Sequence, residues 1–155
     1  MRSNRSIDTD VLSAGFAHLL PAGHLRRLCL MNSLSANRPL TSTERDLARH
    51  MLTRGGREGA NFLSQLEQAE VTQWHCLCGC ASINFQIKGH PEAKPGVHIL
   101  GDFVCGPEDA PSGVFIFESG GLLSGIEVYG LAGDAPKMLP SPDELRSLQD
   151  ARNEA

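Results

Sequence analysis

Residues 71–87, VTQWHCLCGCASINFQI, decide the fold that we expect of this chain. Apolar side chains recur at every second position along this stretch, and three cysteines fall on the opposite parity. One face would hold Leu77, Ala81, Ile83, Phe85 and Ile87, and the other Cys76, Cys78, Cys80, Ser82, Asn84 and Gln86. Because a period of two is typical of a half-buried strand, the pattern predicts one strand across the whole stretch.

Three further strands are predicted downstream. They cover residues 97–105, 114–117 and 122–129, after a loop at residues 89–96 that contains glycine and proline. The triplet Ser119-Gly120-Gly121 is typical of the turn in a hairpin between the last two strands. Four strands in succession predict an antiparallel meander.

Two helices are predicted upstream of the strands. Thr41 and Glu44 have the spacing of a capping box, and Gly55 with Gly56 would end the helix that begins there. A second helix would begin near Gly59. Its apolar face would contain Phe62, Leu63, Leu66 and Ala69. Each helix needs a surface that buries its apolar face, and one face of the sheet offers it.

The predicted fold class is therefore α+β, with an N-terminal helical hairpin packed on an antiparallel sheet of about four strands. A short C-terminal helix is indicated by Ser141-Pro142-Asp143-Glu144, where a cap residue precedes a proline and two acids. A chain of 155 residues fits one domain. We expect residues 1–37 to be a poorly determined N-terminal extension, residues 38–149 a single α+β domain, and residues 150–155 a frayed tail.

Charge is distributed unevenly along the chain. Residues 1–60 carry nine Arg and five acids, whereas residues 61–155 carry five basic and thirteen acidic residues, a net charge of −8. Since the strands lie in the acidic part, nucleic-acid binding through the sheet is disfavoured and a basic protein partner is favoured. An ordinary solvated acidic surface would have the same composition. Oligomeric state is not indicated.

Composition also bears on the compartment. No run of 18 apolar residues is present, so we expect no transmembrane helix. Asp8 and Asp10 do not fit the basic start of a signal peptide. Five cysteines, three of them within five residues, do not fit a secreted disulfide framework. The sequence predicts a cytoplasmic protein.

Cys76, Cys78 and Cys80 are the candidate metal ligands, because thiolates bind zinc. In a straight strand, the Cα atoms of Cys76 and Cys80 would lie roughly 13 Å apart. The Cα atoms of two cysteines that bind one zinc ion can be at most roughly 10 Å apart. A bulge at Gly79 would gather the thiolates. The fourth ligand would then be Cys105, His75 or His98. The alternative is that the three cysteines pack as small hydrophobic residues beneath a helix.

Four segments together resemble a family of small uncharacterised bacterial proteins. They are Cys76–Ile83 (CLCGCASI), Gly113–Phe117 (GVFIF), Leu122–Tyr129 (LLSGIEVY) and Leu139–Pro142 (LPSP). The resemblance covers roughly residues 38–145 and departs at Ala81, where the family has proline, and at residues 119–121, where an Asp-Gly turn is more common. This family has no established activity, so the resemblance implies a helical pair with a cysteine-bearing strand and a hairpin, but no function.

No catalytic residues are predicted. The glycines form neither a phosphate-binding nor a dinucleotide-binding motif, and no cysteine or serine lies in a recognisable nucleophile motif. Small size, the acidic strand region and the absence of a catalytic set favour a non-enzymatic protein-binding module, in the manner of bacterial immunity proteins that neutralise a basic toxin. The alternative is a zinc-binding or thiol-sensing protein that uses Cys76, Cys78 and Cys80, with zinc as the one cofactor considered.

Overall fold

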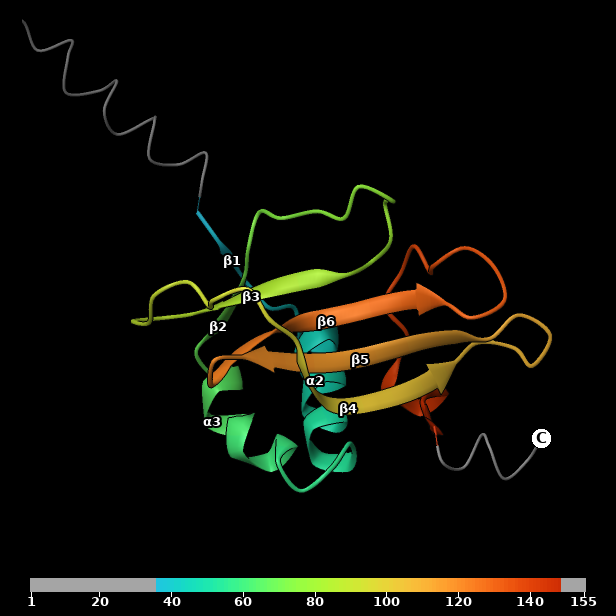
Figure 1. The fold of residues 1–155 in the computed structure, drawn as a ribbon, viewed down its shortest axis with the longest axis horizontal. Helices are drawn as coiled ribbons and strands as arrows, with labels where there is room; N and C mark the ends of the chain where they lie inside the picture. The colour runs from blue at the N-terminus through green and yellow to red at the C-terminus, as the bar shows by residue number, and fades with distance from the viewer. Residues whose placement is uncertain (1–35, 149–155) are drawn as a thin grey trace, which may run out of the picture. The chain divides into compact units, whose positions relative to one another are not determined.

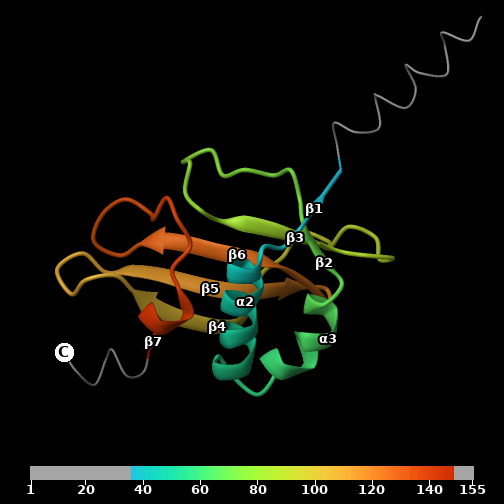
Figure 2. The same cartoon turned by 180° about the vertical axis from the view of Figure 1, so that it is seen from behind.

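The fold is described from a computed structural model, and residues 36–148 are the part of the chain that it describes. Figures 1 and 2 show the chain from two opposite sides. The predicted N-terminal extension, apart from residues 36 and 37, and the predicted tail at 150–155 lie outside the described residues.

Seven strands form one antiparallel sheet in the order β1-β2-β3-β6-β5-β4-β7. The strands are β1 (Arg38–Pro39), β2 (Ala69–Val71), β3 (Ile83–Ile87), β4 (His98–Cys105), β5 (Ser112–Ser119), β6 (Leu122–Gly130) and β7 (Arg146–Ser147). Only β4, β5 and β6 follow one another as a meander, because β3 pairs with β6.

The β5–β6 hairpin is the longest pairing of the sheet, and its strands and turn lie where the sequence predicts them. Gly120 and Gly121 in the turn have φ of 60° and 85°, a left-handed conformation that glycine adopts without steric cost. The predicted strand at 97–105 is likewise confirmed as β4. These segments have strong local signals, namely alternating apolar residues and a glycine turn.

Among the described residues, the longest helix is α2 (Ser42–Arg54), and it covers one face of the sheet (Figure 2). Its buried side chains are Leu47, Ala48, Met51 and Leu52. They pack in one core with the buried residues of the strands, among them Val114, Ile116, Leu123, Ile126 and Val128. Burial of each large aliphatic side chain stabilises the fold by about 1.5–3 kcal/mol. Of the described residues, no helix is both long enough and apolar enough to cross a membrane.

The expected helical hairpin on a four-stranded sheet is wrong, although the mixture of helix and antiparallel sheet is loosely compatible with an α+β class. The second helix is only a 3-10 turn, η1 (Gly59–Phe62), followed by the single α-helical turn α3 (Leu63–Leu66). Gly59 lies against the backbone of Leu52, where a Cβ would be 2.4 Å from the Leu52 carbonyl oxygen. Since the chain enters β2 at Ala69, no room remains for a longer helix.

The predicted C-terminal helix is also shorter than expected. Ser141 and Glu144 do form a capping box, but it opens only one 3-10 turn, η2 (Pro142–Glu144). Leu145 then has extended geometry, with φ −80° and ψ 127°. The next two residues pair with β4 as β7. Pairing with an open strand edge therefore replaces helix continuation here.

The strand predicted over 71–87 is wrong in its first two thirds. It divides into β2 and β3, with a loop over residues 72–82 between them. Alternation holds in β3, where Phe85 and Ile87 are buried. In the loop it fails, and Leu77, which the pattern places on the core face, is fully exposed at 106%.

We predict that Glu44 stabilises the start of α2 in a pH-dependent way. Its carboxylate accepts a hydrogen bond from the Thr41 N–H at 2.8 Å. It also accepts hydrogen bonds from both terminal nitrogens of Arg38, at 2.7 and 2.8 Å, which join β1 to the helix. Hydrogen bonds from Arg38 hold the pKa of Glu44 below its ordinary value of 4.5. A lowered native pKa contributes stability above the unfolded-state pKa, and this contribution is lost as the pH falls through the native pKa.

Glu44→Gln should therefore lower the free energy of unfolding by about 1 kcal/mol at neutral pH. Urea denaturation at neutral pH and well below the carboxyl pKa measures the difference, which should vanish in acid. Asp46→Asn, at an exposed site on the same helix, is the control and should change little. A deficit for Glu44→Gln that persists unchanged in acid would contradict this account.

Candidate metal centre

The three cysteines of residues 76–80 lie in a turn of the β2–β3 loop. The Gly79 N–H donates to the Cys76 carbonyl oxygen at 2.9 Å, and Gly79 has φ of 71°. This left-handed residue reverses the local chain direction, which a straight strand cannot do. The distance objection to a shared ion, valid for a strand, therefore does not apply to the turn.

The three sulfur atoms come together. The Sγ atoms of Cys76, Cys78 and Cys80 all lie within 4.8 Å of one another, and those of Cys76 and Cys78 are 3.0 Å apart. Tetrahedral zinc with bonds of about 2.3 Å separates its sulfur ligands by about 3.8 Å. The Cys76–Cys78 separation is shorter than that value and no pair exceeds 4.8 Å, so small side-chain rotations would bring the sulfur atoms to ligand geometry.

Hydrogen bonds from two other segments hold this turn in place. The Ala81 N–H donates to the Pro136 carbonyl oxygen at 2.9 Å, and the Lys137 ammonium donates to the Cys78 carbonyl oxygen at 2.9 Å. On the other side, the Val128 N–H of β6 donates to the Ser82 hydroxyl oxygen at 3.0 Å. The turn is therefore attached both to the sheet and to the loop after β6.

Proton affinity differs between the thiols of the turn. Burial raises the pKa of Cys80, but the hydroxyl and N–H of Ser82 and the thiols of Cys78 and Cys76 outweigh it and lower that pKa to about 7. Cys76 has its pKa raised to about 11, chiefly because its thiol is hydrogen-bonded to Cys78. A metal ion that binds all three sulfurs must therefore displace protons.

The predicted fourth ligands are not part of this group. Cys105 is buried in β4, where its thiol donates to the Ser112 carbonyl oxygen at 3.6 Å and where burial raises its pKa. His98 lies 2.8 Å from a carboxylate oxygen of Glu58, which raises the pKa of the imidazole. His75 immediately precedes the turn. Within residues 36–148, the three cysteines alone form a group of ligand atoms close enough for one metal ion, and the identity of a fourth ligand stays a prediction.

Sequence reasoning identified the cysteines but not the residues that support them. Lys137 is separated from Cys78 by 59 positions, and no local pattern marks such a contact. Ser82, which the alternation places on the polar face, is buried, and its hydrogen bond to β6 depends on the β3–β6 pairing that the predicted meander excluded.

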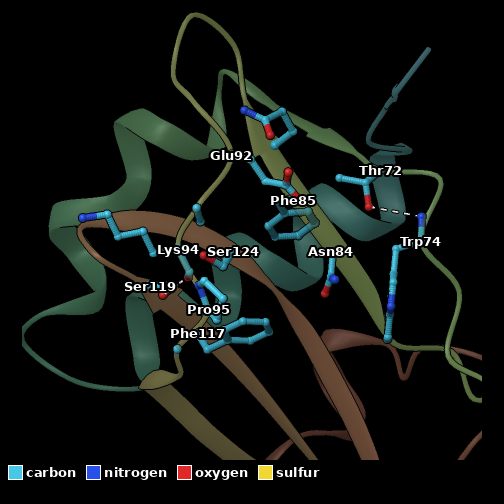
Figure 3. A pocket seen from close by; sticks show the side chains of 13 residues that line it. Thr72, Trp74, Asn84, Phe85, Glu92, Lys94, Pro95, Phe117, Ser119 and Ser124 are labelled. Carbon is cyan, nitrogen blue, oxygen red and sulfur yellow. Dashed lines mark hydrogen bonds between the residues drawn. The ribbon is translucent and has the colours of Figure 1, made fainter. Parts of the chain in front are cut away.

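A groove beside the start of the β2–β3 loop was also not predicted. It has a volume of about 450 Å³ and is lined by residues from β3, from the loops before and after it, and from the β5–β6 hairpin. In Figure 3, Asn84 lies between the rings of Phe117 and Trp74, and Pro95 approaches from the following loop. Trp74 is 42% exposed.

No family model, no curated protein and no solved structure matches this chain. The resemblance to a family of small bacterial proteins thus stays a prediction.

Proposed function

We propose that this protein binds a thiophilic metal ion, zinc, through the thiolates of Cys76, Cys78 and Cys80. The observation that carries the proposal is the convergence of three sulfur atoms within 4.8 Å around the Gly79 turn. Three sulfur ligands favour soft cations such as zinc over magnesium or calcium, which prefer oxygen.

Exposure of the turn favours a site that keeps a coordination position available. Cys78 is exposed, and Cys76 and Cys80 are half-buried. A structural zinc site is closed by four protein ligands, whereas three protein ligands leave a fourth position for water or an incoming donor. The three thiolates therefore support an accessible ion rather than one enclosed by the fold.

Zinc binding by these thiolates predicts one ion per chain in reduced protein. The test is a titration under anaerobic conditions in competition with a chromophoric chelator, with Co²⁺ as a second probe whose sulfur-to-metal absorption reports thiolate ligation. Cys78→Ser should weaken binding by more than about tenfold, because loss of even a hydrogen-bonding partner of a ligand costs about that much.

Cys105→Ala is the matched control for this titration, since it removes one thiol from β4 and leaves the turn intact. The zinc affinity of the Cys105→Ala variant should equal that of the unsubstituted protein. Absence of a stoichiometric ion in the reduced protein, or an equal loss in both variants, would contradict the proposal.

Lys137 should strengthen metal binding by charge. Zinc with three thiolates carries a net charge of −1, and the Lys137 ammonium lies beside the turn, 2.9 Å from the Cys78 carbonyl oxygen. Lys137→Met should lower zinc affinity about threefold at low salt, and added salt should reduce the difference. Lys94→Met, with the same charge change in the loop after β3, should leave the affinity unchanged; an equal loss there would rule out a local effect of Lys137.

Thiol sensing is a second candidate function, favoured by the 3.0 Å separation between the Cys76 and Cys78 sulfurs. A peroxide would oxidise the two thiols to a disulfide, and the peroxide would be reduced to two waters or to water and an alcohol. Peptide mass spectrometry after peroxide treatment should find the loss of two hydrogen atoms in the peptide that contains residues 76–80, and bound zinc should slow this loss. Oxidation of Cys105 at the same rate would contradict selective sensing.

A protein-binding role of the immunity type stays a prediction, because no comparison bears on a partner.

A further inference from the structure

The face of the sheet opposite α2 carries a cluster of aromatic rings. In β5, Val114 and Ile116 are buried against the helix side, so the alternate residues Phe115 and Phe117 lie on the other face. Tyr129 of β6 joins them. Figure 1 shows this face toward the viewer, with α2 behind the strands. The three rings are only half-buried.

Two glycines allow the rings to lie close to the sheet. Tyr129 lies across Gly113, where a Cβ would be 2.0 Å from the tyrosine Cζ, and Phe117 lies against Gly125. The Phe115 centroid is 5.9 Å from both other ring centroids. The result is a contiguous aromatic layer that no helix within residues 36–148 covers.

Carboxylates flank this layer on both sides. Phe115 pairs directly with Glu127 on β6 and with Asp102 on β4, so the three side chains form one row across the sheet. Asp102 accepts a hydrogen bond from the Tyr129 hydroxyl at 3.2 Å. The Glu127 carboxylate has no hydrogen bond or ion pair with any other residue in the described part of the chain. We call Phe115, Phe117, Tyr129, Asp102 and Glu127 the aromatic face.

No Lys or Arg from the four strands beneath this face neutralises it, and Arg146 of the edge strand β7, which pairs with Val104, donates to the Gly106 carbonyl oxygen at 3.1 Å. The four strands β3, β4, β5 and β6 contain Asp102, Glu118 and Glu127 but neither Lys nor Arg. The arginines gather on the helix side instead, with three in α2 alone. The aromatic face is therefore complementary in charge to a basic surface.

We propose that the aromatic face binds a basic protein segment by inserting its arginine side chains between the rings and the carboxylates of Asp102 and Glu127. A guanidinium group stacks on aromatic rings and pairs with a carboxylate through two parallel hydrogen bonds, whereas a lysine ammonium does neither as well. The groove beside Phe117, with exposed Trp74 on its far wall, extends the apolar part of this surface. This surface does not depend on the metal site.

A titration of isotope-labelled full-length protein with two peptides of equal charge and length tests the proposal by NMR. One peptide alternates arginine with glycine, and the other alternates lysine with glycine. The arginine peptide should shift the resonances of the aromatic face and bind more tightly than the lysine peptide by about tenfold. Shifts confined to other surfaces, or no binding by the arginine peptide, would overturn the proposal.

Charge-matched variants separate this face from general attraction between acid and base. Glu127→Gln should weaken binding of the arginine peptide about tenfold. Glu108→Gln, at an exposed site in the β4–β5 loop, should change the affinity for that peptide less than about twofold. Equal losses in the two variants would mean that only net charge matters and would overturn the proposal.

A ring variant tests the stacking itself. Phe115→Leu keeps an apolar side chain at the site, and a dispersed NMR spectrum checks that it remains folded. Its arginine peptide affinity should fall to that of the lysine peptide, whereas an unchanged preference would overturn the stacking role. A shift of the aromatic-face resonances with protein concentration, when no peptide is present, would overturn the proposal. That result would assign the face to contact with a second copy of the chain.

Discussion

The fold depends on the burial of one face of the β4–β5–β6 meander beneath α2. Leu47, Met51 and Leu52 on the helix meet Val114 and Ile116 on the middle strand, and all five are almost completely inaccessible to solvent. Close packing at the helix end requires glycines at two positions. A Cβ on Gly55 would lie 2.3 Å from the Cα of Gly101, so neither glycine has room for a side chain.

Local signals predicted the parts of the fold that local interactions form. The Thr41 to Glu44 capping box and the hairpin with its Gly120-Gly121 turn are present as expected, because each is made by residues near in sequence. Errors arose where distant pairing decided the outcome. The strand β3 pairs with β6 although residues 88–121 lie between them in the chain, and β7 takes the free edge of β4 in place of a C-terminal helix.

The candidate site illustrates the same limit. Alternation in residues 71–87 counted Leu77 and Ala81 as core positions, although Gly79 between them has a conformation that ends a strand. The cysteines could be identified as ligand types from their sequence alone. Their convergence could not, because it depends on the turn at Gly79 and on its attachment to Pro136, Lys137 and β6.

The proposed metal ligands and the folding core are different residues in this molecule. All three thiol ligands belong to one five-residue turn, so an ion there would join no distant parts of the chain. A metal that closes only a short loop adds little to the stability of the whole fold, since the unfolded chain keeps the same ligands close together. The core beneath α2 contains none of the three cysteines among its fully buried residues.

Strand β6 lies between the two proposed sites and contacts both. The Val128 N–H donates to the Ser82 hydroxyl, which is 3.2 Å from the Cys80 sulfur. The residues on either side of Val128 in β6, Glu127 and Tyr129, belong to the aromatic face. Coupling between sites requires an element with two alternative arrangements. Because β6 is paired with β5 along its length and with β3 beside the turn, and Val128 is buried in the core, it is held in one register. The two sites should therefore act independently, so that occupation of the thiols leaves the affinity of the aromatic face unchanged.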